Sequence, residues 1–303
     1  MRVDRWAAGP IPGQSLCAVC GEPTGTDGWC NRCPPPWSPA RDHLEVVDGP
    51  VGAVSDLGST HWRNEDAVGV RWVEGNPGGF ALVVCDGVSV SQDPHLVSQV
   101  AVDTALQVLW EAVATGGDLG AAMVAATAAA QRAAAAVPYD PSLDVGPGAC
   151  TFVAAAVRGS LAGFASVGDS RAYWVDASGA VQIGRDDSLA AELIASGRFT
   201  TSQAMRRADA HALTRWLGVD STGAGPSVTV VELPGPGLVV LASDGLWNYA
   251  PTPAAMASLI GPVGAETTIA LARRLAGFAN ASGGADNITV AVGPHGIDRQ
   301  EGR

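Results

Sequence analysis

The chain of 303 residues is acidic, with a formal net charge of −12. A protein that neutralises a nucleic-acid backbone needs a basic surface, so this charge disfavours nucleic acid as the main partner. All 18 basic residues are arginines, and the lack of lysine excludes P-loop nucleotide hydrolases, protein kinases and Schiff-base enzymes, whose chemistry needs that side chain.

The first chemical signature along the chain is two Cys-x2-Cys pairs. They are formed by Cys17, Cys20, Cys30 and Cys33. Two such pairs complete a closed four-sulfur site for a structural Zn²⁺ ion, so residues 1–33 are predicted to form a small zinc-ribbon-like module. The alternative is two disulfides in a secreted domain. Zinc and a cytoplasmic location are favoured because no signal peptide precedes the pairs, and because Cys85 and Cys150 stand alone.

A proline-rich stretch at residues 34–44 predicts a linker, because proline enters neither a helix interior nor a central strand. A larger domain is expected over residues 45–296, followed by a tail at 297–303. The apolar runs of this larger domain are too short to cross a membrane, which takes about 20 apolar residues. A nucleic-acid-binding ribbon with an enzymatic passenger is the weaker interpretation, because Arg32 is the only basic residue between the first and last of the four cysteines.

Short apolar runs predict the strands of the larger domain. These runs are Val51–Ser55, Phe80–Cys85, Thr151–Val157, Ala162–Val167, Leu238–Ala242 and Ile288–Val292. A Gly-Asp-Ser turn at residues 168–170 predicts a returning strand that begins with Ala172–Val175. Helices are expected around residues 95–114, 120–136, 186–208 and 264–279. The domain is therefore expected to mix strands and helices.

Acidic residues recur at the ends of these predicted strands. The five acidic stations are Glu65 with Asp66, then Asp86, Asp169, Asp244 and Asp286. Each one alone is open to interpretation as an ordinary turn residue. Gathered at one sheet edge, they would repel one another unless a cation lay between them. Oxygen ligands without His or Cys favour Mg²⁺ or Mn²⁺, and such ions activate water for attack on phosphorus, so hydrolysis of a phosphate ester is predicted.

In their order, the motifs of this domain resemble the protein phosphatase 2C family of metal-dependent Ser/Thr phosphatases, and its bacterial members most closely. The motifs are SDLGSTHWRNEDAV, ALVVCDGVS, GACTFVAAAV, GFASVGDSRAYWV, RDDSLAAELIASGRFTTSQAMRRADAHALTRWLG, LVVLASDGLW and GADNITVAV. The resemblance implies an α+β fold, a four-layer α-β-β-α sandwich of two antiparallel sheets flanked by helices. It also implies hydrolysis of phosphoserine and phosphothreonine in proteins that a Ser/Thr kinase has phosphorylated.

The same resemblance implies a binuclear Mg²⁺ or Mn²⁺ centre and a role for each ligand. Asp86 would bridge both ions, and the backbone carbonyl of Gly87 would contribute a further oxygen. Asp244 and Asp286 would complete the shell of one ion, while Glu65 would approach the second ion through water. The three aspartates, together with a phosphate-binding arginine, would form the catalytic set.

Further positions are implied around that centre. Asp66 would be the partner of the preceding glutamate, and Asn287 would support the last motif. Asp169 would hold a third, weaker metal ion, and Arg171 would orient or neutralise its carboxylate. Residues 186–218 resemble the flap that lies beside the site in the family.

Two departures from the family pattern bear on catalysis. The family usually places an arginine five positions before the Asp of its Glu-Asp pair, but His61 stands there in this chain. Arg63, two positions later, has the fork needed to bind phosphate with two hydrogen bonds and is the candidate clamp. The loop after Asp-Gly reads VSV at residues 88–90, where bacterial members often have Met-Gly-Gly, and no general acid is assigned. For His61 and His95 a solvated or structural role is favoured.

The leading hypothesis is an active phosphatase, and the alternative is a phosphatase-fold module that is weak or inactive and senses a phosphoprotein or another ligand. Loss of the usual arginine favours the alternative. Retention of Asp86, Asp244 and Asp286 opposes it, because a sensor needs no metal-activated water.

Overall fold

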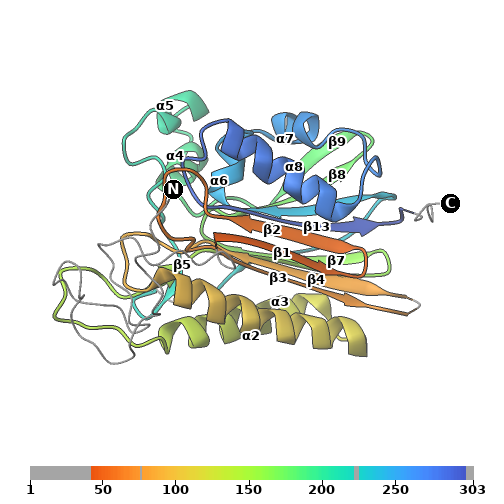
Figure 1. The fold of residues 1–303 in the computed structure, drawn as a ribbon, viewed down its shortest axis with the longest axis horizontal. Helices are drawn as coiled ribbons and strands as arrows, with labels where there is room; N and C mark the ends of the chain where they lie inside the picture. The colour runs from red at the N-terminus through yellow and green to blue at the C-terminus, as the bar shows by residue number, and fades with distance from the viewer. Residues whose placement is uncertain (1–41, 76, 222–224, 298–303) are drawn as a thin grey trace, which may run out of the picture.

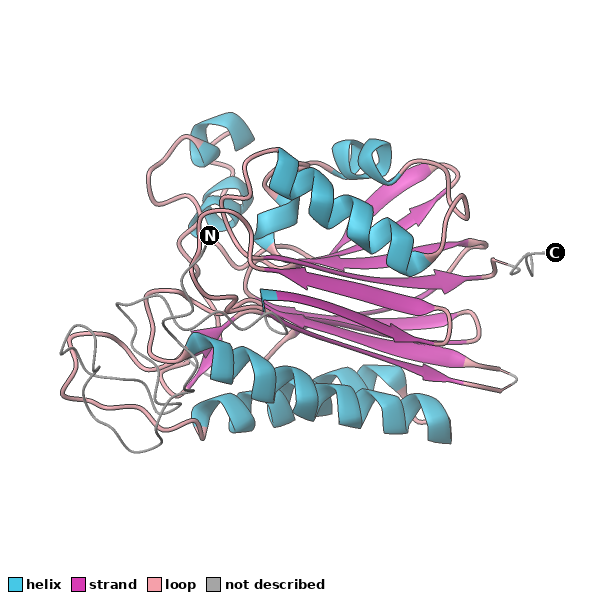
Figure 2. Cartoon of the chain, in the orientation of Figure 1, coloured by secondary structure: helices cyan, strands magenta, loops and turns pink. Residues whose placement is uncertain are grey.

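The computed structural model describes residues 42–75, 77–221 and 225–297, which form two antiparallel sheets stacked face to face with helices on both outer sides (Figure 1; Figure 2). The four cysteines predicted to bind zinc lie outside these residues. The arrangement of two antiparallel sheets flanked by helices confirms the predicted α+β fold. Among the described helices, none combines the length and apolar character that a membrane span requires.

The two sheets differ in size. The six-stranded sheet has the order β1 (His43–Asp48), β2 (Val51–Asp56), β13 (Ile288–His295), β12 (Gly237–Ala242), β8 (Arg171–Asp176), β9 (Gly179–Ile183). The five-stranded sheet has the order β11 (Ser227–Glu232), β7 (Leu161–Val167), β6 (Phe152–Arg158), β4 (Gly79–Cys85), β3 (Ala67–Val73). Two further short strands, β5 (Ala149–Cys150) and β10 (Leu217–Gly218), pair with each other. Strand β5 lies at the left end of the sandwich in Figure 1.

Helices cover the outer face of each sheet (Figure 1). The five-stranded sheet carries α2 (Pro94–Thr115) and α3 (Leu119–Ala135). The six-stranded sheet carries α6 (Asp244–Trp247), α7 (Pro253–Ile260) and α8 (Thr268–Ala281). Two short helices, α4 (Leu189–Ala195) and α5 (Thr201–Met205), belong to the segment predicted as the flap.

Three apolar layers hold the four structural layers together. The middle layer joins the two sheets, and one of its centres is Leu241, which lies between the small residues Ala172 and Ala291 of the neighbouring strands. Separate clusters pack α2 and α3 on the five-stranded sheet, and α6, α7 and α8 on the six-stranded sheet. Central strands such as β4 are therefore buried on both faces, which explains their unbroken apolar sequence.

The predicted strands are found within one to three residues of their expected ends. The predicted helix at 186–208 is wrong, because the structure contains the two short helices α4 and α5 there instead. Gly197, with φ of +70°, follows the first helix, and Thr200 starts the second with a capping box. Strand β1 begins at His43, two residues before the predicted start of the domain.

Candidate active site

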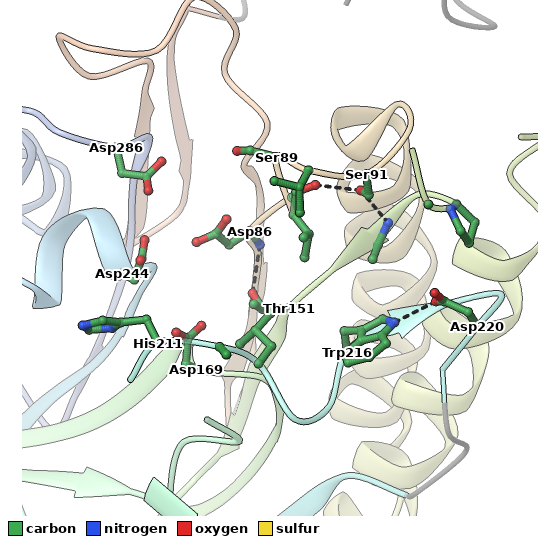
Figure 3. Close-up of a pocket in the computed structure, with 18 residues that line it drawn as sticks. Asp86, Ser89, Ser91, Thr151, Asp169, His211, Trp216, Asp220, Asp244 and Asp286 are labelled. Carbon is green, nitrogen blue, oxygen red and sulfur yellow. Dashed lines mark hydrogen bonds between the residues drawn. The ribbon is translucent and has the colours of Figure 1, made fainter. Parts of the chain in front are cut away.

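Carboxylates from both sheets lie at one end of the sandwich, where strands of each sheet begin or finish. Asp86 follows β4 and Asp169 follows β7 in the five-stranded sheet, whereas Asp244 follows β12 and Asp286 precedes β13 in the six-stranded sheet. The end of one antiparallel strand meets the start of its neighbour, so all four positions reach the same edge. They line one cleft with a volume of about 480 Å³ (Figure 3).

The backbone of Asp86 is held by Thr151, while its carboxylate faces the cleft (Figure 3). The Asp86 N–H donates to the Thr151 hydroxyl at 3.0 Å, and the Thr151 N–H donates to the Asp86 carbonyl at 2.8 Å. The Thr151 hydroxyl also shares a hydrogen bond with Ser170 at 2.7 Å. A side chain at Gly87 would meet the Glu65 carbonyl oxygen at 2.6 Å, so only glycine fits beside Asp86.

Asp169 is buried in the turn between β7 and β8, next to Gly168 with its φ of +100°. Arg171 does not pair with this carboxylate. Its guanidinium binds both oxygens of Asp186, with its shortest contact at 2.7 Å, and lies 3.5 Å from the centre of the Trp247 ring. Burial and neighbouring carboxylates raise the pKa of Asp169. The positive charge of Arg171 lowers it by a smaller amount. Arg171 therefore acts mainly as an anchor for the first residue of the flap.

The two acidic residues before β3 have different surroundings. The Glu65 N–H donates to the side chain of Asn287 at 2.7 Å, and Glu65 Oε2 accepts a hydrogen bond from the Ser89 hydroxyl. Asn287 also donates to the carbonyl of Arg63 at 3.1 Å, so it ties this segment to the start of β13. The carboxylate of Asp66 is buried, and this burial raises its pKa while the nearby hydroxyls of Thr289 and Ser243 lower it.

The carboxylates at this edge are strained electrostatically. Burial, with added repulsion from neighbouring carboxylates, raises the pKa of Asp86 and Asp169 well above the usual range. The same causes raise the pKa of Asp244 to about 6 and that of Asp66 to about 7. A bound cation would reverse this effect by favouring the charged carboxylates.

The donor set fits a hard divalent cation. It consists of carboxylate oxygens, and one of them, Asp244 Oδ1, is buried without a hydrogen-bond partner in the described part of the chain. Within residues 42–75, 77–221 and 225–297, no three His, Cys, Asp or Glu side chains lie close enough together to hold a metal ion by themselves. Mg²⁺ sites commonly use one or two carboxylates and keep several waters, so an open arrangement suits this ion better than it suits zinc.

The predicted phosphate clamp lies outside the residues that line the cleft. Arg63 is buried, with its Nη1 3.1 Å from His95 Nδ1 and its guanidinium 4.8 Å from the centre of the Trp62 ring. His95 thus has a structural contact, as expected. His61 instead reaches the site, because its Nε2 lies 3.2 Å from Asp286 Oδ1.

Several cleft residues were not identified from the sequence. Ser89 and Ser91 come from the loop after Asp86, and His211 and Trp216 come from the flap. The ring of His211 stacks on Trp247 with their centres 6.0 Å apart. The position of the flap beside the site follows from the resemblance, but the choice of which flap side chains face the cleft depends on the tertiary structure.

Sequence comparison identifies the class of protein to which this fold and this cluster of carboxylates belong. The profile described as Protein phosphatase 2C matches residues 59–275, and the chain belongs to this family.

Individual relatives agree with this assignment. The chain is 31% identical over 156 residues to the Serine/threonine phosphatase stp of Listeria innocua, and the match covers 50% of this chain and 59% of that relative, less than two thirds of its length. The crystal structure of the Mycobacterium tuberculosis serine/threonine phosphatase PstP/Ppp is 27% identical, with a TM-score of 0.64 over 82% of this chain and 98% of that chain. A structure of the PstP catalytic domain in complex with two manganese ions is 28% identical, with a TM-score of 0.60 over the same shares.

Proposed function

We propose that this protein hydrolyses phosphoserine and phosphothreonine in proteins at a binuclear Mg²⁺ or Mn²⁺ centre. The observation that carries the proposal is the meeting of Asp86, Asp244 and Asp286 from two sheets in one cleft. When bound, the two ions would supply an activated water and would neutralise the charge of the substrate phosphate. A module that only senses phosphoproteins is disfavoured because all five acidic stations are retained.

The residues of the chain have distinct roles in this proposal. Asp86 would hold both ions, and its two hydrogen bonds with Thr151 fix its backbone so that the carboxylate stays aimed at the cleft. Asp244 and Asp286 would complete the ligand shell of one ion. The Gly87 carbonyl would contribute a further oxygen, and Glu65 would hold a water of the second ion. Asp66 would act behind these ligands, and Asp169 would hold a third ion.

Arg63 is proposed to bind the substrate phosphate. Its guanidinium fork suits a phosphate, but it is hydrogen-bonded to His95, so phosphate binding would require this contact to be exchanged. His61 is the alternative candidate for contact with the substrate phosphate, because its ring lies against Asp286 in the site.

The first experiment is hydrolysis of an aryl phosphate and of a phosphothreonine peptide in EDTA, Mg²⁺ and Mn²⁺, with the wild type and Asp86→Asn. We expect metal-dependent turnover that falls by several orders of magnitude in the variant, because a bridging ligand is lost. Asp103→Asn, an exposed change on α2, is the matched control. A folded wild type that binds Mn²⁺ and hydrolyses neither compound would refute the proposal and support a sensor.

A structural zinc site is proposed for Cys17, Cys20, Cys30 and Cys33, which lie outside the described residues. Elemental analysis should find one Zn²⁺ per chain, and Cys17→Ser combined with Cys20→Ser should remove it. A cytoplasmic setting, in which the substrates are proteins phosphorylated by a Ser/Thr kinase, completes the proposal.

A further inference from the structure

The cleft has two chemically different ends (Figure 3). Asp244 and Asp286 lie at one end, with Asp86 and Thr151 near the middle. The far end is formed by Trp216 with Asp220, a pair that none of the proposed catalytic steps uses. In a peptide substrate, the side chains that flank the phosphorylated residue would therefore meet a different environment from the one that binds the phosphate.

Trp216 is held in a fixed position relative to the metal-binding loop. Leu217 pairs with Cys150, and Cys150 in turn forms a bridge with Gly87, so three chain segments lie side by side. Leu217 is buried, and Trp216, the residue just before β10, lines the cleft. Its indole Nε1 donates to Asp220 Oδ1 at 2.8 Å, which fixes the ring plane.

The cleft that contains this indole also has apolar lining residues. Val88, Val90, Pro147 and Leu213 share the lining of the cleft with it. Val90, one of these lining residues, is 82% exposed, so its aliphatic side chain lies in water. An apolar side chain placed between such groups would be removed from water together with them, and that burial is favourable.

The charge of the cleft selects against acidic substrates. Its described lining contains five aspartates and neither arginine nor lysine, with His211 as the one group that could carry positive charge. The proposed metal ions would offset the charges of Asp86, Asp169, Asp244 and Asp286, which leaves Asp220 as the remaining carboxylate of the lining. Asp220 lies at the Trp216 end and is exposed, so a basic side chain that reaches this end would be attracted and an acidic one repelled.

We infer that the Trp216–Asp220 end of the cleft selects the residues that flank the phosphorylated residue, taking an apolar side chain against Trp216 and a basic one beside Asp220. The occupant is thus a segment of phosphoprotein substrate with an apolar and basic flank. This inference rests on the proposed phosphatase function and adds its substrate class.

The apolar preference is tested with phosphothreonine peptides that differ at a single flanking position, occupied by Leu or by Ala. We expect the wild type to have a kcat/KM about tenfold higher for Leu at the best position, as burial of one apolar side chain provides. In Trp216→Ala this ratio should fall close to one, and in Trp216→Phe most of it should remain. Each enzyme is its own control, because partial unfolding or weaker metal binding lowers kcat/KM for both peptides by the same factor.

The charge preference is tested with a second pair that carries Arg or Glu. Asp220→Asn keeps an oxygen for the indole N–H but removes the charge, so the Arg-to-Glu ratio of kcat/KM should fall by about threefold or more. The wild-type ratio should also shrink at high salt.

The outcomes separate the two proposals. A wild type that hydrolyses the aryl phosphate but treats both peptide pairs alike overturns the inference and leaves the phosphatase function in place. Retained selectivity in both Trp216→Ala and Asp220→Asn overturns it as well, because the selection then lies elsewhere. A wild type inert toward all substrates with Mn²⁺ bound overturns the proposed function itself.

Discussion

The hydroxyl of Ser89 donates a hydrogen bond of 2.5 Å to Oε2 of Glu65. Burial raises the pKa of Glu65, and the hydrogen bond from Ser89 lowers it by stabilising the charged carboxylate. Ser89 therefore orients and helps to ionise the residue proposed to hold a water of the second ion. It is a positioning residue supplied by the VSV sequence of this loop.

Ser89→Ala should weaken the proposed centre. Hydrogen bonds to charged groups contribute about 1.5 to 3 kcal/mol, so we expect kcat/KM at limiting Mn²⁺ to fall by about ten- to a hundredfold, and the loss to be relieved in part at high Mn²⁺. Manganese titrations of activity and of binding measure this effect. Ser89→Thr, which retains the hydroxyl, should stay near the wild type, and an alanine variant with unchanged Mn²⁺ dependence would contradict the assignment.

Arg171→Gln should destabilise the fold much more than loss of an exposed ion pair does. Arg171 joins β8 to Asp186, to the carbonyl of Pro251 and to the face of Trp247, and its side chain is largely buried. Breaking a buried pair costs about 3 to 5 kcal/mol. Urea unfolding of Arg207→Gln is the control, since the pair of Arg207 with Asp209 is exposed and should contribute little to stability. Equal unfolding midpoints for the two variants would refute the anchoring role.

Two glycine substitutions should change stability in opposite directions. Gly87→Ala would place a methyl group 2.6 Å from the Glu65 carbonyl oxygen, forcing the backbone to move and lowering both thermal stability and Mn²⁺ affinity. Gly277 lies exposed within α8 with open space where its Cβ would point. Gly277→Ala should therefore stabilise the protein by about 0.5 to 1 kcal/mol. Differential scanning calorimetry compares the two, and a stabilised Gly87→Ala variant would contradict the packing of this turn.

The contribution of His43 to stability should depend on pH. Its Nδ1 lies 2.6 Å from Asp56 Oδ2, and this hydrogen bond, with a second one to Glu45, raises its pKa. The folded state thus binds the proton more tightly than the unfolded chain. The stabilisation is fully present below the ordinary histidine pKa of about 6.5 and is lost as the pH rises through the raised value.

His43→Gln should consequently lower the urea midpoint more at pH 6 than at pH 9. The imidazole is half exposed, so the difference will be small and must be measured with both proteins at constant ionic strength. A larger loss at pH 9 than at pH 6 would show that the sign is wrong.

The success of the sequence-based predictions follows burial. Strands β4 and β12 are buried on both faces, so their apolar runs were unmistakable. The edge strands β1, β9 and β11 are partly exposed and carry mixed sequences, and they were not predicted. Asp86, Asp169, Asp244 and Asp286 could be found because each lies next to such a buried run, whereas Glu65 and Asp66 precede β3, an edge strand that was not predicted.

The arginine and the flap could not be resolved in the same way. The sequence indicates that Arg63 can bind phosphate but contains no signal that His95, at the start of a helix 32 residues later, lies against it. Trp216 reaches the cleft because β10, at the end of the flap, pairs with Cys150, a contact between residues far apart in the chain. Both depend on tertiary pairing, which local periodicity does not encode.

The carboxylates of the cleft belong to two layers whose contact is built from apolar side chains. Asp86 and Asp169 extend from one sheet, and Asp244 and Asp286 extend from the other. An ion shared across this edge would therefore fasten the layers together as a non-covalent cross-link, besides its part in chemistry. Its concentration would then set the resistance of the fold to heat, since a ligand bound only by the native state stabilises it by mass action. Chelation should open the rim of the sandwich first, while the interior between the sheets stays closed.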